Sequence, residues 1–178
     1  MAITRLGGAN AITGTIPTSV APGQGKILQT VQGTTNTQVS TTGITFTDTG
    51  LSATITPSST SSKILIIVSQ HCYLNNNNLT YAFGGLRILR GSSSVWNPNP
   101  ENGSGSLGFG GQLTSGNNIS NFYQIVTLNY LDTPSTTSAT TYKTQQRAYA
   151  SETGTIITQI NDSNQNGSSS ITLMEIQG

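Results

Sequence analysis

The sequence predicts an all-β protein, an antiparallel β-sandwich of the jelly-roll kind with an extended N-terminal arm. Three observations lead to this prediction. Apolar and polar residues alternate with period two from residue 26 onward, and no stretch of ten residues has the spacing of an amphipathic helix. Threonine-rich segments are separated by clusters of Gly, Pro, Ser and Asn, as the strands of a sandwich are separated by turns. We therefore assign residues 1–25 to the arm and residues 26–178 to the β-sandwich domain.

The arm combines apolar side chains with glycines and prolines that rule out a continuous helix. Its apolar residues cannot all reach a small core, so we expect the segment to dock on another protein. A frayed terminus, or an arm that wraps its own sandwich, is the alternative. The docking candidates are Ile3, Leu6, Ile12, Ile16 and Val20.

Residues 63–73 should form the central strand, because they are apolar and β-branched on both faces. We expect this strand to be covered on both sides. One face would carry Ile64, Ile66 and Val68, and the other Leu65 and Ile67.

Residues 51–56 alternate as a half-buried strand, bracketed by turns at Asp48-Thr-Gly and Pro57-Ser-Ser. Residues 170–177 should end the chain as a strand paired in the sheet. The other strand candidates are residues 27–32, 36–40, 44–47, 80–90, 121–130, 139–149 and 153–160.

Residues 97–118 are the longest interruption of the strand pattern, with six glycines and two prolines. We expect a long loop at one end of the sandwich, where binding loops tend to lie. The candidates for exposed contacts there are Trp96, Leu107 and Phe109.

Composition excludes several classes of protein. Seven basic residues and a net charge of +1 cannot form the stripe that neutralises a nucleic-acid backbone. The longest apolar run covers residues 64–68, far short of the roughly 20 residues that span a bilayer. The first residues lack the apolar core of a secretory signal, and a single cysteine excludes an internal disulfide, so we expect synthesis in a reducing cytoplasm. Leu, Ile, Val and Phe total 40 of 178 residues, a thin core that favours a homo-oligomer.

Little in the sequence points to catalysis. His71 and Cys72 are neighbours in a strand and face opposite sides, so they cannot act together as base and nucleophile or as metal ligands. Asp48, Asp132 and Asp162 lie in turn contexts, where a side-chain bond to the backbone explains them. We expect no catalytic, metal or cofactor site. A carboxylate pair in a groove, as in a surface-degrading depolymerase, is the enzymatic alternative.

Six stretches of the sequence have a familiar pattern, and together they run through most of the chain. They are residues 1–17, 25–33, 46–68, 86–91, 131–145 and 171–176. These stretches resemble small virion proteins of tailed bacteriophages, particularly marine and cyanobacterial ones of the tail-fibre-like kind.

The resemblance implies a β-rich module on the virion surface, often trimeric, and brings no functional residues with it. We expect a non-enzymatic structural protein, a short tail fibre or fibre tip held by its arm. The alternative is a capsid decoration protein that binds the major capsid protein through the arm. The expected partners are two further copies in a homotrimer, other virion proteins, and a host-surface glycan.

Overall fold

The computed structural model describes residues 25–75, 81–97, 109–112, 121–148, 154–162 and 164–178. In these residues the chain is all-β without any helix, and every strand pairing is antiparallel. No helix in this part of the chain is long and apolar enough to cross a membrane. The expected arm, with its five docking candidates, lies outside the described residues.

The larger sheet is built around its longest strand, β4. One side of β4 pairs with β8 along its whole length, and the other side pairs first with β13 and then with β10. The strands of this sheet are β1 (Ile27–Thr35), β13 (Ser169–Ile176), β4 (Lys63–Asn75), β8 (Asn121–Asp132), β10 (Thr155–Thr158) and β2 (Val39–Thr41).

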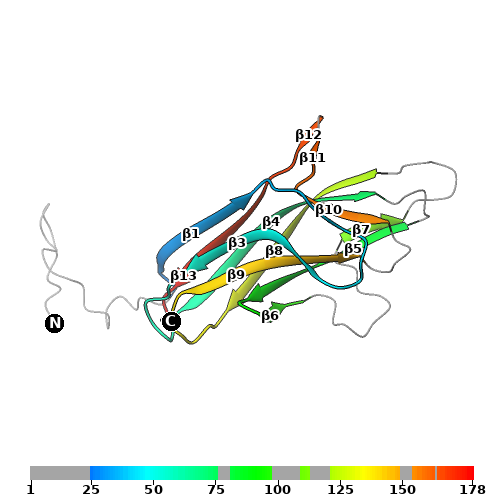
Figure 1. Cartoon of the computed structure of the whole chain (residues 1–178). Helices are drawn as coiled ribbons and strands as arrows, with labels where there is room; N and C mark the ends of the chain where they lie inside the picture. The colour runs from blue at the N-terminus through cyan, green and yellow to red at the C-terminus, as the bar shows by residue number, and fades with distance from the viewer. Residues whose placement is uncertain (1–24, 76–80, 98–108, 113–120, 149–153, 163) are drawn as a thin grey trace, which may run out of the picture.

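The smaller sheet packs on the larger one, and a two-stranded hairpin projects from the end of the sandwich opposite to the C-terminus (Figure 1). The sheet contains β3 (Thr47–Ile55), β9 (Thr140–Ala148), β5 (Tyr81–Arg90), β6 (Ser93–Trp96) and β7 (Phe109–Gln112). The hairpin consists of β11 (Asn161–Asp162) and β12 (Gln165–Asn166).

The strand order identifies the sandwich as a jelly roll. Four strands in the order β1-β13-β4-β8 face four in the order β3-β9-β5-β6. Along the chain these eight strands switch sheets at every step except from β5 to β6, so that two Greek keys interlock. The predicted fold class is therefore confirmed, as is the paired C-terminal strand, which lies between β1 and β4.

The core lies between the sheets, and β4 supplies its centre as predicted. Ile64, Ile66 and Val68 are fully buried within one apolar cluster that draws on both sheets. Leu65 and Ile67 face outward and are half-buried. The expectation that both faces of this strand are covered was wrong for the described residues, because its neighbours shield the outer face only from the sides.

The strand predicted at residues 51–56 is the second half of β3, whereas the strand predicted at residues 44–47 contributes only Thr47 to β3, and residues 44–46 form no strand. The turn predicted at Asp48-Thr-Gly is a bulge in that strand, where the register with β9 shifts between Asp48 and Ser52. Gly50 has φ +79, a conformation that glycine adopts without strain. The turn residues were recognised correctly, but pairing with β9 continues on both sides of them.

A layer of polar side chains crosses the core. Gln70 of β4 accepts a bond from Thr144 Oγ1 of β9 at 2.8 Å and donates to Ser169 Oγ of β13 at 2.9 Å. Gln159, with its amide oriented so that both ends are satisfied, donates to Thr49 O at 3.0 Å and accepts from Ser169 Oγ at 2.7 Å. A satisfied network of this kind fixes how the two sheets register on each other.

The strands β1 and β3 approach so closely at Gly33 that a side chain has no room. A Cβ atom on Gly33 would collide with the backbone carbonyl of Ser52. We expect Gly33→Ala to lower the free energy of unfolding by roughly 1–3 kcal/mol, because one strand must move. Urea denaturation measures the change. Gly43→Ala is the matched control: its nearest neighbour would be Thr41 Oγ1 at an ordinary 3.6 Å, and its effect should stay within about 0.5 kcal/mol.

Candidate functional site

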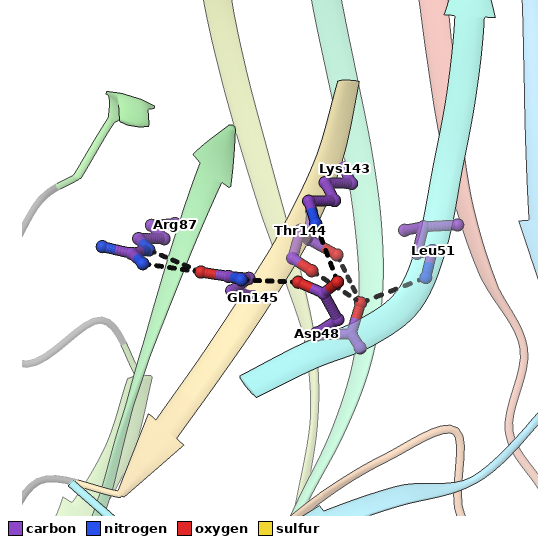
Figure 2. A network of polar contacts seen from close by, with 7 residues as sticks. Asp48, Leu51, Arg87, Lys143, Thr144 and Gln145 are labelled. Atoms are coloured by element: carbon purple, nitrogen blue, oxygen red, sulfur yellow. Dashed lines mark hydrogen bonds and ion pairs between the residues drawn. The ribbon is translucent and has the colours of Figure 1, made fainter. Parts of the chain in front are cut away.

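A row of polar side chains crosses three strands on the outer face of the smaller sheet (Figure 2). We call Arg87, Gln145, Asp48 and Lys143 the polar row. Gln145 of β9 pairs with Asp48 of β3 on one side and with Arg87 of β5 on the other, so the sheet itself places the three side chains in line.

The bonds within the polar row are short and complementary. Asp48 accepts from Lys143 Nζ at 2.8 Å and from Gln145 Nε2 at 2.5 Å. Gln145 Oε1 in turn accepts from Arg87 Nε at 2.9 Å and Nη2 at 2.6 Å. The amide therefore links the guanidinium to the carboxylate and uses both of its ends.

The electrostatics of the polar row suit binding better than proton transfer. Partial burial opposes the charge on Asp48, but the bonds from Lys143 and Gln145 and the nearby charges of Lys143 and Arg87 lower its pKa. The carboxylate therefore stays ionised at neutral pH, whereas a general acid needs a raised pKa.

Phe46 brings a second guanidinium to the same face. Arg87 lies 4.1 Å from the centre of the Phe46 ring and Arg147 lies 4.9 Å from it. Both distances fit cation–π contacts. Three of the seven basic residues of the chain thus gather on the outer face of the smaller sheet, beside one described carboxylate, Asp48.

The bulge of β3 couples the polar row to the core. Asp48 reaches toward Lys143 and Gln145 on the outer face (Figure 2), while the next residue, Thr49, is buried. Thr49 Oγ1 lies 2.5 Å from Thr144 Oγ1. Thr49 Oγ1 also accepts the backbone N–H of Leu51 at 3.2 Å, which fixes the shape of the bulge. These bonds hold the bulge, and Asp48 with it, against the core.

A separate group of charged and polar side chains, centred on Asp132, links the two sheets. Asp132 at the end of β8 accepts from Arg90 Nη1 at 2.8 Å and from Tyr142 Oη at 2.6 Å, and both donors come from the smaller sheet. Burial, reinforced by the bond to Asp132, raises the pKa of Tyr142, so the phenol stays protonated and donates. The Asp132 carboxylate therefore joins the end of β8 to β5 and β9 of the opposite sheet.

The interpretation of the aspartates as backbone-bonded turn residues was wrong for Asp48 and Asp132, which bond to side chains on neighbouring strands or the opposite sheet. It was right for Asp162, whose Oδ1 accepts the N–H of Asn164 at 2.8 Å in the hairpin. Sequence spacing could not reveal these partners, because each lies 10 to 97 positions away along the chain.

Aromatic side chains meet on the outer face of the larger sheet, near the projecting hairpin. The rings of Tyr73 and Tyr123 lie 4.6 Å apart, and Gln165 Nε2 of β12 donates to Tyr123 Oη at 2.6 Å. Tyr123 remains exposed while it covers Tyr73. The arrangement presents an aromatic surface bordered by an amide, which suits a subunit contact or the apolar face of a sugar.

His71 and Cys72 lie on opposite faces of β4, as predicted. Cys72 is buried in the core, and burial raises the pKa of its thiol. His71 is half-buried on the outer face, where burial lowers the pKa of its ring. Within the described residues no group of three or more His, Cys, Asp or Glu side chains is placed to hold a metal ion.

Of the three candidates for exposed loop contacts, the structure describes the side-chain burial of one, Trp96. Trp96 ends β6 and packs, half-buried, against the core cluster instead of lying in an exposed loop. Phe109 begins β7, so a strand interrupts the predicted loop of residues 97–118. Leu107 lies outside the described residues.

Sequence reasoning missed the polar row and Phe46. A signal was present, because Lys143, Gln145 and Arg147 alternate along β9 and must therefore share one face. Nothing in the spacing showed which side chains of β3 and β5 lie opposite them. A scan against protein-family models finds no match to this chain, and a search of curated proteins finds none either.

Proposed function

We propose that the chain is a non-enzymatic structural protein of a tailed bacteriophage virion, a short tail-fibre or fibre-tip module displayed on the particle. The observation that carries the proposal is the sequence resemblance, whose stretches run from residue 1 to residue 176. The jelly roll supports it, because this architecture recurs in viral capsid and lectin domains.

The two outer faces of the sandwich support a role in assembly and contact. The smaller sheet displays the polar row, a charged and hydrogen-bonded surface suited to water or a polar ligand such as a host glycan. The larger sheet displays exposed apolar side chains such as Ile125 and Leu131. A module that joins other protein on one face and meets its surroundings on the other needs this difference.

Copy number tests the proposal. Antibody raised against the purified chain should label phage particles, and quantitative mass spectrometry should find few copies for each particle, as for a tail component. A copy number that matches the capsid shell would establish the alternative, a decoration protein. Absence from purified particles of a phage that encodes the chain would overturn both.

The arm supplies a second test. We expect deletion of residues 2–22 to leave a folded sandwich that no longer joins particles, because the strands begin only at residue 27. Circular dichroism and thermal melting check the fold, and immunoblots of purified virions check incorporation. Incorporation at the normal level would refute docking through the arm. A lower melting temperature without particles would show that the arm wraps its own sandwich.

A further inference from the structure

Among the described strands, β8 lies at an edge of the larger sheet. It pairs with β4 over its full length of 12 residues, from Asn121 opposite Asn75 to Asp132 opposite Ile64, without a register shift. No described strand pairs with its other side. A long regular strand thus presents a row of backbone N–H and C=O groups that another strand can use.

The strand β8 lacks the features that keep edge strands from pairing. Its sequence contains no Pro, Gly, Lys or Arg, and its one charged side chain, Asp132, is bonded to Arg90 and Tyr142. The other two long edges, β1 and β3, approach each other so closely at Gly33 that a Cβ atom there would collide with the Ser52 carbonyl, and β3 is also interrupted by a bulge. Soluble monomers normally protect such edges.

The outer face beside this edge is apolar and nearly free of charge. Ile125, Leu131 and Tyr123 are 55%, 47% and 43% exposed. Leu65 lies directly opposite Leu131 on β4 and is half-buried. Among the described outward-facing residues of β1, β13, β4 and β8, the one charged side chain is Lys63, at the end of β4. Two such faces can approach without like-charge repulsion.

We propose that β8 pairs with β8 of a second copy of this chain, antiparallel and about a two-fold axis near Thr127. With Thr127 on the axis, Tyr123 lies opposite Leu131 and Val126 opposite Leu128, so apolar side chains meet on both faces. The second copy also supplies an unprotected edge of the same length. The two larger sheets then form one continuous sheet, and the contact is the self-complementary kind that two-fold dimers use.

This contact rests on the proposed function, since it specifies how copies of the virion module associate with each other. It joins copies in pairs. The homotrimer expected from the sequence would require another interface. Light scattering of the purified full-length protein should give twice the chain mass of 18.6 kDa at micromolar concentration. A mass of one chain or of three chains overturns the pairing. Neither result bears on whether particles contain the protein, which copy number decides.

A cysteine at the axis locates the contact. Thr127→Cys should form a disulfide-linked pair under mild oxidation, since the two positions would face each other across the new strand pair. Gln32→Cys, exposed on β1 of the same sheet, is the control and should remain unlinked, and the native Cys72 is buried. Equal linking of both variants, or of neither, contradicts the β8 contact.

Charge on the edge should break the pair. We expect the double variant Thr127→Lys and Asn129→Lys to halve the mass measured by light scattering, with the circular dichroism spectrum unchanged. The same two lysines placed on β1, as Thr30→Lys and Gln32→Lys, should leave the pair intact. A pair that survives lysines on β8, or dissociates equally with lysines on β1, overturns the proposal.

Discussion

Replacing Ile66 with aspartate should prevent the domain from folding. Ile66 is 0% exposed, lies between Leu173 of β13 and Tyr130 of β8, and belongs to the shared core of both sheets. A carboxylate there has no partner, and burying it would cost several kcal/mol, a large part of the roughly 5–15 kcal/mol that stabilises a typical domain. We expect the variant to accumulate in inclusion bodies, or to be soluble but to lack the β-sheet signal in circular dichroism.

Two further variants make this expectation quantitative. Ile66→Ala should fold but lose roughly 2–5 kcal/mol in urea denaturation, the range found for deleting a large apolar side chain from a core. Ser52→Asp places the same charge on an exposed position of β3 opposite Lys143 and should change stability by less than about 0.5 kcal/mol. If Ile66→Asp and Ser52→Asp were equally soluble and stable, the buried position assigned to Ile66 would be contradicted.

Local patterns predicted the long strands well, because period two is a property of each strand by itself, whereas the four-residue strands β6 and β7 were not predicted. Residues 63–73 are apolar on both faces, so the pattern grouped Ile64, Ile66 and Val68 on one face but could not show that this face alone is fully buried. The same run could not reveal that Gln70, the next inward position, is also fully buried. A glutamine is tolerated there because Thr144 and Ser169 reach it from strands 74 and 99 positions away.

The candidate surfaces were harder to predict because they depend on pairing between distant strands. The polar row exists because β9 lies between β3 and β5, which brings Asp48 and Arg87 to the two sides of Gln145. Similarly, the sequence identifies Ile125 only as a strand residue, and its place at the edge of a sheet depends on where β8 lies in the strand order. Sequence patterns predicted the long strands, but the strand order determined which side chains act together.

The carboxylate of Glu175 should make the domain depend on pH. Glu175 is 0% exposed on β13, yet its Oε1 accepts from Ser58 N at 2.7 Å and from Ser58 Oγ at 2.6 Å, and its Oε2 accepts from Gln29 Nε2 at 2.6 Å. Burial alone would raise the pKa of Glu175, but these bonds, together with the nearby Ser62 hydroxyl, lower it from 4.5 to about 2. The charged form is therefore favoured by folding.

The sign of the effect follows from the lowered pKa. Glu175 binds a proton near pH 4.5 in the unfolded chain and only near pH 2 in the folded chain. The stabilisation by the Glu175 carboxylate is therefore complete above about pH 4.5 and is lost as the pH falls toward 2. A difference of this size corresponds to about 3 kcal/mol at neutral pH. Glu175→Gln should lower the free energy of unfolding by about that amount at pH 7, because an amide nitrogen would face the donors of Ser58 or Gln29.

Urea denaturation of both proteins between pH 2 and 7 measures this contribution, and the difference between them should shrink below about pH 4.5. Ser58→Ala keeps the backbone donor and removes the hydroxyl donor. It should therefore lower the free energy of unfolding by less than Glu175→Gln does, over the same pH range. A difference between wild type and Glu175→Gln that stays constant with pH would contradict the role given to the charge. Because Glu175 joins β13 to Gln29 of β1, acid should loosen the end of the sandwich where β1 begins, which is also where the expected arm would leave the domain.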